Sequence, residues 1–496
     1  MQRVHIEFQR VQTWLFAVPR LRAMVGANAL LGRALRVALP DLARQTGCGW
    51  ALAPSHANYP SADPNDPLKD YDDPAADAKA GILSRDGGHF EARFSNGASE
   101  FAAAAANLLR SCLPGLRFRI SIDGAGTAKN QVHLSTELPV LAPCEWTGRG
   151  LASAIVKQGS EQPIVSPDVA QRHQAATQTE DGTAVDLASL LSARTKLQKL
   201  ERPQELKELV GNGYLALIHA DGNGIGSGAG KTEAERAAFF HRNRVLLRRA
   251  LQQAIDRHCP NAGLAPLILL MLGGDDILLV TDDILLVTRA EIALPFVVTL
   301  CTALDALQGN ETGFRLTLGI GVVIARHTIP VHRLHEVAEQ LTSSAKRRFR
   351  GFTQGEKKHS VVDWAVYSTA WVDNPEDVRR RDWLRGNSTD LRVLSQRPVN
   401  VLGQELDSLQ GLAHAAQKLG HAPRSQLRYL VDQLPRGRAL SALAFAELPT
   451  RGKGTLAQAG VKELWRRAGN AWITPLLDLV EIAEIARLGV TPGHRP

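Results

Sequence analysis

The chain has 496 residues, of which 44% are hydrophobic and 22% are charged, and it carries a formal net charge of +8. This length exceeds what one ordinary core needs, so we expect about two to four domains. The five cysteines lie far apart without a CxxC pair, which argues against a disulfide framework or a cysteine-bound metal cluster. The basic excess is compatible with polyanionic partners but does not require them.

The apolar stretches are short. The longest lie near residues 264–272 and 277–280, and neither reaches the ~20 residues that a membrane-spanning helix requires. The N-terminus lacks the basic, apolar and small-residue order of a signal peptide. We therefore expect a cytoplasmic protein without a membrane partner.

The first ~125 residues follow a β-α-β-β-α-β pattern. "VHIEF" (4–8), "HFEARF" (89–94) and "LRFRISI" (116–122) read as strands, with helical periodicity over 11–45 and 100–113. "CGWALAP" also reads as a strand. The stretch 59–86, rich in Asp and Pro, is predicted to be an exposed loop. Residues 126–205 are weakly patterned and read as a connector with short elements.

Residues 214–364 repeat this layout with stronger patterning. "YLALIHAD" reads as a buried strand that ends in Asp221, and Thr232 with Glu235 predicts a capping box at the start of a helix. The apolar runs "LAPLILLML" and "DILLV" flank "GGDD", which indicates a hairpin. "RLTLGIGVVIA" reads as the next strand, and a helix follows from Pro330. Residues 385–490 have helical periodicity with almost no strand signal.

Three carboxylates are predicted to meet at this hairpin. Gly273 and Gly274 let the backbone turn and approach a ligand, and they present Asp275 and Asp276 beside Asp221. Two carboxylates ~4 Å apart repel each other by about 1 kcal/mol in water, and by more where water is excluded. A divalent cation such as Mg²⁺ or Mn²⁺ relieves this repulsion and binds phosphates as well. Two such ions would suit phosphoryl transfer.

The heptad "DDILLVT" occurs twice in succession, over 275–288. Only the first copy follows two glycines. Asp282 and Asp283 come one strand-length later, so we expect them at the opposite end of the sheet, without a catalytic role. The nearby "DGNGIGSGAGKT" fits neither the Walker A nor the GxGxxG spacing, and it reads as a flexible turn.

Four stretches together resemble a known family. "ALIHADGNGIG", "MLGGDD", "LTLGIGVVIA" and "SSAKRR" are similar, in order and spacing, to the palm domain shared by GGDEF nucleotide cyclases and the large subunit of type III CRISPR effector complexes (Csm/Cmr-like). The GGDD form points to the CRISPR branch. "FQRVQTWLFAVPRLRAMVGANALLGRAL" resembles the degenerate first palm of that subunit, and "ITPLLDLVEIAEIA" suits its helical tail.

The resemblance implies an α+β fold with two ferredoxin-like palm domains, the first degenerate, followed by an α-helical C-terminal domain. The expected boundaries are 1–125 for the first palm, 126–205 for the connector, 206–370 for the GGDD palm and 371–496 for the helical domain. The stretch 143–156 resembles the family's small zinc element but retains only Cys144, so we predict no structural zinc. Since the chain starts at the palm-like strand, no preceding HD nuclease domain is expected.

The resemblance also implies an activity, the synthesis of cyclic oligoadenylate from ATP in RNA-guided antiviral defence. Asp221 and the Gly222 carbonyl would bind metal, and Asp275 and Asp276 would hold metal and activate the 3′-hydroxyl. Lys346 would contact the triphosphate as a point charge. Asn223 stands where the family often has a second aspartate, which removes one anionic ligand.

Three functions stay open at this stage. The first is a metal-dependent cyclic oligonucleotide synthase that works with CRISPR effector subunits, guide RNA and target RNA. The second is a non-catalytic scaffold of such a complex, and the third is a stand-alone cyclic dinucleotide synthase, possibly dimeric. The base preference is undetermined. The stretch "VRRRDWLRG" could bind RNA phosphates and stack on a base through Arg379, Arg380, Arg381 and Arg385 with Trp383, although a solvated linker is the simpler interpretation.

Overall fold

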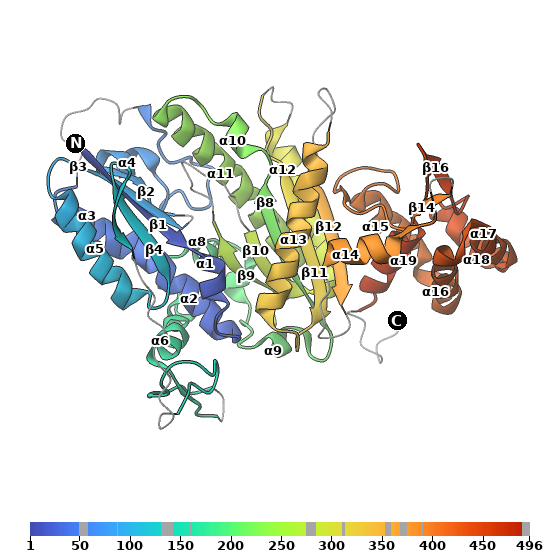
Figure 1. The fold of residues 1–496 in the computed structure, drawn as a ribbon, viewed down its shortest axis with the longest axis horizontal. Helices are drawn as coiled ribbons and strands as arrows, with labels where there is room; N and C mark the ends of the chain where they lie inside the picture. The colour runs from blue at the N-terminus through green and yellow to red at the C-terminus, as the bar shows by residue number, and fades with distance from the viewer. Residues whose placement is uncertain are drawn as a thin grey trace.

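The computed structural model describes residues 1–48, 58–86, 88–129, 142–158, 161–273, 284–309, 313–352, 359–367, 374–387 and 390–488. Figure 1 shows an elongated arrangement, with the N-terminal sheet at one end, a central sheet with its helices in the middle and the C-terminal helices at the other end. Most of the hydrophobic side chains lie in cores within and between these parts.

The N-terminal domain is built on a five-stranded sheet of order β2-β3-β1-β4-β5, in which neighbours are antiparallel. The predicted strands at 4–8, 89–94 and 116–122 and the predicted helices are confirmed here, with β2 and β5 in addition, whereas "CGWALAP" lies outside the described residues except for Cys48. Alanines and leucines of α5 pack with the inward residues of β1, β3 and β4. The elements are β1 (Gln2–Gln9), α1 (Val11–Leu15), α2 (Leu21–Arg33), a π-helical turn (Ala34–Ala38), α3 (Leu39–Gln45), α4 (Pro74–Lys79), β2 (Ile82–Ser84), β3 (His89–Phe94), α5 (Ala98–Cys112), β4 (Arg117–Ile122) and β5 (Ala125–Lys129).

The Asp- and Pro-rich stretch 59–86 is not the exposed loop that its composition predicts. Asp66 and Asp72 are 3% and 5% exposed. Arg248 of the long helix α11 (Glu233–His258) lies 2.7 Å from Asp66 and 2.6 Å from Asp72. Arg244 adds a second ion pair to Asp72. Paired charges can be buried because each supplies the other's hydrogen bonds, so this segment fastens the N-terminal domain to the central one.

The connector crosses between the two sheets with short elements. Cys144 is buried there beside Val18, Ala23 and Val156. A two-stranded ribbon and several short helices complete it, namely β6 (Ala154–Ile155), β7 (Ile164–Val165), α6 (Pro167–Ala175), α7 (Thr177–Glu180), α8 (Leu187–Ser192), a 3-10 turn (Lys196–Lys199) and α9 (Leu206–Val210).

The central sheet has six strands in the order β15-β12-β11-β8-β10-β9. β8 lies between β10 and β11 and pairs antiparallel with both, while β11 and β12 are parallel. The strands are β8 (Tyr214–Gly222), β9 (Leu267–Leu272), β10 (Ile284–Arg289), β11 (Leu318–Arg326), β12 (Val361–Tyr367) and β15 (Val399–Asn400).

Helices cover both faces of this sheet, and α13 (Val331–Arg350) crosses its front in Figure 1. Ala216, Ile218 and Ala220 of β8 belong to the core formed with α11 and α12 (Ala290–Gln308), whereas Leu215 and Leu217 pack with α13. The predicted capping box of Thr232 and Glu235 is present. Within the described ranges, α12 alone is long and apolar enough to span a membrane by length and composition, but its buried face belongs to this core.

The hairpin differs from its prediction. The strand that pairs with both β9 and β8 is the second copy of the repeated heptad, because Ile284 lies opposite Leu272 and Ala220. The first copy, including "DILLV" at 276–280, lies outside the described residues. Asp282 and Asp283 are outside them too, but Ile284, which follows directly, begins at the same end of the sheet as Asp221. The expectation that the second acidic pair lies at the opposite end stays a prediction, and the register of Ile284 argues against it.

The C-terminal part is not purely helical. A four-stranded sheet of order β13-β14-β17-β16 joins its helices. These strands are two or three residues long, too short for a pattern of alternation to reveal them. The elements are α14 (Pro375–Val378), a π-helical turn (Arg379–Trp383), β13 (Leu384–Arg385), β14 (Leu391–Val393), α15 (Leu409–Lys418), a 3-10 turn (Leu419–His421), α16 (Arg424–Gln433), a second 3-10 turn (Leu434–Arg436), α17 (Arg438–Glu447), α18 (Thr450–Gln458), β16 (Arg466–Ala468), β17 (Ala471–Ile473) and α19 (Leu476–Ile485).

The N-terminal and central domains share one hydrophobic cluster. Phe16, Leu21 and Met24 of the first domain pack with residues of β8, β9, β10, β11 and α13. The Phe16 ring lies 4.9 Å from the ring of His335 on α13. This shared core fixes the first domain beside the face of the central sheet that carries Asp221.

Candidate functional site

Asp221 is the second-last residue of β8, an inner strand of the central sheet. Side chains alternate along a strand, so Asp221 shares the face of Leu215 and Leu217, under α13. The residue is 7% exposed. Its partner across the ladder is Gly319 of β11. The sequence thus correctly predicts a carboxylate at the end of a buried strand.

Lys346 lies over this carboxylate. Its Nζ makes an ion pair with Oδ2 of Asp221, and 23% of the Lys346 side chain is exposed. A Cβ on Gly319 would lie 2.7 Å from Cγ of Lys346 and 3.0 Å from Oδ1 of Asn223. Real Cβ atoms essentially never make a contact as short as 2.7 Å, so glycine at 319 leaves the room that the Lys346 side chain needs to pair with Asp221.

Asn223 is held by the beginning of β11. Its backbone N–H donates to the Thr317 carbonyl at 2.8 Å, and Nδ2 donates to Thr317 Oγ1 at 3.3 Å. The side-chain amide therefore makes a bond that an aspartate could not donate. Oδ1 of Asn223 is buried, without a hydrogen-bond partner among the described residues. A buried acceptor of this kind fits a cation or a donor from a ligand.

These groups are suited to a hard divalent cation. The Asp221 carboxylate, the Gly222 carbonyl and the Asn223 Oδ1 follow one another in the chain, and all three are oxygen donors of the type that Mg²⁺ takes. In the described part of the chain, no three His, Cys, Asp or Glu side chains gather as a metal-binding group. Gly274, Asp275 and Asp276, predicted to complete the site, lie outside the described residues.

Gly273 connects this site to the domain interface. It follows the last residue of β9 and lines a cavity of about 360 Å³ between the N-terminal domain and the central sheet. Arg10, in the left-handed conformation at φ 56°, lies on the opposite wall with the turn that follows β1. A non-glycine residue in this conformation is strained, and such strain clusters at ligand sites. Sequence patterns did not reveal this cavity, because its walls come from separate domains.

Two carboxylates in the cavity wall have different partners. Asp86 forms an ion pair with Arg36 at 2.6 Å. Asp186 accepts hydrogen bonds from Asn28 Nδ2 at 2.7 Å and from the Ser189 N–H at 2.9 Å. Burial raises the pKa of Asp186 even though these bonds favour its charged form. The cavity wall thus combines these polar groups with the apolar side chains of Leu31, Leu35 and Leu272.

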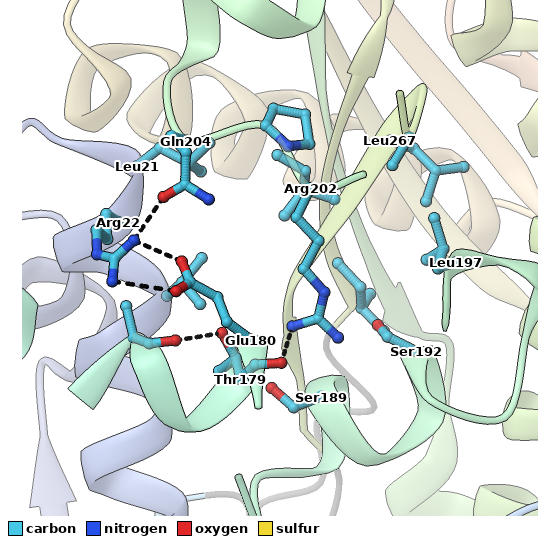
Figure 2. Close-up of a pocket in the computed structure, with 16 residues that line it drawn as sticks. Leu21, Arg22, Thr179, Glu180, Ser189, Ser192, Leu197, Arg202, Gln204 and Leu267 are labelled. Atoms are coloured by element: carbon cyan, nitrogen blue, oxygen red, sulfur yellow. Dashed lines mark hydrogen bonds and ion pairs between the residues drawn. The ribbon is translucent and has the colours of Figure 1, made fainter. Parts of the chain in front are cut away.

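Figure 2 shows a smaller cavity of about 70 Å³ between α2, the connector and β9. Arg22 donates to Glu180 at 2.5 Å and to Gln204 at 2.6 Å, and Arg202 donates to the Thr179 carbonyl. The charged groups in this cavity wall thus bond to other groups of the same wall. We interpret it as part of the joint between the domains.

Some residues of the stretch "VRRRDWLRG" contact the rest of the fold, and others are exposed to solvent. Arg379 forms an ion pair with the buried Asp363 and donates to Ser344 Oγ at 2.8 Å. The Trp383 ring lies 4.3 Å from the guanidinium carbon of Arg397. Arg380 and Arg381 are exposed. Arg379 and Trp383, the second and sixth residues of this run, are therefore tied into the fold, and the solvated-linker interpretation fits Arg380 and Arg381.

Comparison with known proteins supports the architecture. No family model and no curated relative matches the chain. A solved structure described as the Csm1–Csm4 cassette in complex with cA4 matches at TM-score 0.50 and 12% identity, over 99% of this chain and 70% of that one. The likeness establishes the fold. Cassette structures in complex with pppApApA and with one ATP match at TM-scores 0.46 and 0.43, at 13% and 14% identity, over 98% and 99% of this chain and 69% and 70% of theirs.

The neighbours are subcomplexes of the type III-A CRISPR–Csm effector. The mixed α/β architecture of this chain, with a central sheet flanked by a smaller N-terminal sheet, agrees with that resemblance.

The glycines at 319 and 321 were missed as site residues by the sequence analysis. A Cβ on Gly321 would lie 2.2 Å from the Ala338 carbonyl of α13. Their spacing of two places both on the face that meets this helix, a signal that the sequence did contain.

Proposed function

We propose that this chain is a metal-dependent nucleotidyltransferase that makes cyclic oligonucleotides, from ATP, within a type III CRISPR-like RNA-guided complex. The observation that carries the proposal is the group of Asp221, Asn223 and Lys346 assembled over Gly319, on a strand that pairs with β10, the strand that follows the "GGDD" stretch. The fold likeness to a cassette described in complex with cA4 supports the choice of product.

The residues divide the chemistry between them. Asp221, the Gly222 carbonyl and Asn223 Oδ1 would hold Mg²⁺ or Mn²⁺, together with Asp275 and Asp276. A bound divalent ion supplies charge neutralisation at the reacting phosphate. Lys346 offers an ammonium that can move its contact from Asp221 to a phosphate oxygen. The reaction joins a 3′-oxygen to an α-phosphorus, releases pyrophosphate, and transfers the hydroxyl proton to a carboxylate of the acidic pair.

The cavity between the domains offers room for a second nucleotide. Its volume of about 360 Å³ falls in the range of small-molecule pockets. Gly273 belongs to its wall and also begins the "GGDD" stretch, so a molecule bound there would approach the reacting groups from the N-terminal domain. Two nucleotides facing each other across this interface are what the joining of one nucleotide to another requires.

The test is product analysis by mass spectrometry. The purified chain, alone and with CRISPR backbone subunits, guide RNA and target RNA, is incubated with ATP or GTP and with Mg²⁺ or Mn²⁺. We expect oligonucleotide products that disappear in Asp221→Ala and in Asp275→Ala/Asp276→Ala. Identical product profiles in wild type and these variants would refute the proposal. A product of two nucleotides formed without RNA would instead identify a stand-alone cyclic dinucleotide synthase.

A scaffold role is the second candidate, and one observation favours it. The Asn223 amide bonds to Thr317, so this position serves the fold as well as any ligand. Under that function, guide RNA and effector subunits bind, while no activator produces nucleotide turnover.

A further inference from the structure

A basic groove of about 830 Å³ lies beside the candidate site, where α13 ends against β12 and β15. Residues from the C-terminal end of α13 line it, namely Ser344, Arg347 and Arg348, followed by Gly351 and Phe352. His359, Arg379, Pro398 and Asn400 complete the lining. Within the described residues, no carboxylate lines the groove. Three guanidinium groups line the groove, and the acids that pair with two of them, Glu376 and Asp363, are not among its lining residues, so the groove favours an anionic ligand.

The basic side chains differ in how firmly they are held. Arg379 is fixed by Asp363, which is fully buried, and by Ser344. Arg347 pairs with Glu376 at 2.5 Å, but 65% of the Arg347 side chain is exposed. Exposed ion pairs contribute little, so a phosphate can replace Glu376 at small cost. Arg348 is exposed on the same turn. The groove therefore combines one preorganised donor with two adaptable ones.

This groove and Asp221 lie at the same end of the central strands. Asp221 pairs with Gly319, Gly319 with Val361, and Val361 with Asn400, so four strands form one continuous row. With neighbouring strands ~4.8 Å apart, Asn400 lies about 14 Å from Asp221. Stacked nucleotides advance ~3.4 Å each, so an oligonucleotide of about four residues spans this distance.

We propose that the groove binds the phosphates of a short single-stranded oligoribonucleotide that extends from the Asp221 site. Arg347 and Arg348 contact its phosphodiesters, and Phe352 offers an aromatic face for a base. Positive charge along the backbone together with a ring for stacking is the arrangement that binds single strands without reading their sequence. The identity of this ligand rests on the proposed function, whereas the anion site itself rests on the groove.

The experiment measures binding of a 5′-labelled adenosine tetraribonucleotide to the full chain by fluorescence anisotropy, at several salt concentrations and without divalent metal. We expect Arg347→Ala/Arg348→Ala to weaken binding about tenfold and to lower the salt slope by about 1.4, since each lost phosphate contact on a single strand accounts for ~0.7. Arg379 is left intact because its removal would leave Asp363 buried without its ion-pair partner.

The matched control is Arg380→Ala/Arg381→Ala, which removes the same charge from exposed residues near Arg379 that do not line the groove. We expect its affinity to stay within about twofold of wild type, and circular dichroism melting confirms that both variants fold. Equal losses in both variants would reduce the effect to net charge and overturn the inference, as would no loss in either. If Arg347→Ala/Arg348→Ala loses as much affinity for labelled ATP as for the tetranucleotide, the groove binds a mononucleotide and the inference is overturned.

Failure of the two proposals is distinguishable. A wild-type chain that binds the tetranucleotide in the groove but forms no product under any condition contradicts the proposed function alone. A chain that forms product while the groove variant and its control bind equally contradicts only this inference.

Discussion

Deletion of residues 275–281 removes one copy of the repeated heptad and tests how the hairpin is built. Leu272 and Ile284 already face each other in the ladder, and eleven residues, 273–283, connect them. After the deletion, four residues remain, and they read Gly-Gly-Asp-Asp. No described strand loses a residue. If the first copy is only an extended connection, its removal shortens a loop and leaves β9, β10 and their partners unchanged.

The expected size follows from loop closure. Shortening a connection from eleven residues to four favours its closure by about 0.9 kcal/mol, from (3/2)RT ln(11/4). Local opening of the hairpin then becomes about four- to fivefold rarer. If the first copy packs in the core instead, its deletion has a far larger effect on stability. Each buried Ile, Leu or Val side chain contributes about 1.5–3 kcal/mol to the free energy of unfolding. Loss of the four apolar residues of a packed strand would therefore unfold the region.

Hydrogen exchange followed by mass spectrometry measures this difference on peptides that cover β9 and β10. We expect four- to fivefold slower exchange in the deletion variant. The control replaces residues 275–281 with a Gly/Ser heptad of the same length and should exchange as wild type does. Faster exchange or loss of the fold in the deletion variant would refute the reasoning, since it would mean that the first copy packs in the core.

Further predictions concern charge. The sequence alone predicts no effect of Asp282→Asn/Asp283→Asn on nucleotide turnover. We expect lower turnover, because the strand that follows these residues begins beside Ala220. Unchanged turnover would leave the catalytic role to Asp275 and Asp276 alone. Lys346→Met should weaken ATP binding about tenfold in calorimetry while the fold is retained, because a phosphate loses one charged contact; unchanged affinity would exclude Lys346 from the site. Arg248→Met should destabilise the protein by about 3–5 kcal/mol in thermal or urea unfolding, since it leaves buried acids without their partner; Arg249→Met, at the next position, is the comparison. Burial raises the pKa of Asp77 to about 6. A raised carboxyl pKa favours folding at acidic pH and loses that contribution as pH rises through about 6, so Asp77→Asn should gain stability relative to wild type between pH 4 and 7.5; parallel pH profiles would contradict this.

The sequence predicts the elements of both sheets well where alternation or helical periodicity spans a whole element. Asp221 could be placed because an acid at the end of an apolar strand is a local feature. The pairing of "DDILLVT" could not be decided locally, because both copies have the same residues and only the ladder with Leu272 and Ala220 distinguishes them.

Long-range pairing explains the other differences. The acidic stretch 59–86 has a loop's composition, but Arg244 and Arg248 lie more than 170 positions away and convert it into a buried contact. The cavity beside Gly273 is equally non-local, since the turn after β1 forms its opposite wall. The short C-terminal strands depend on partners such as β14 and β17, which lie about 80 residues apart in the chain.

The cluster shared by Phe16, Leu21 and Met24 with the central sheet has a consequence for how the protein can be regulated. Separating the two domains would expose this apolar surface to water, at a cost of about 25 cal/mol for each Å². A hinge between them is therefore a poor switch. Control by a bound partner therefore has to act without separating the two domains, and we expect them to unfold as one cooperative unit.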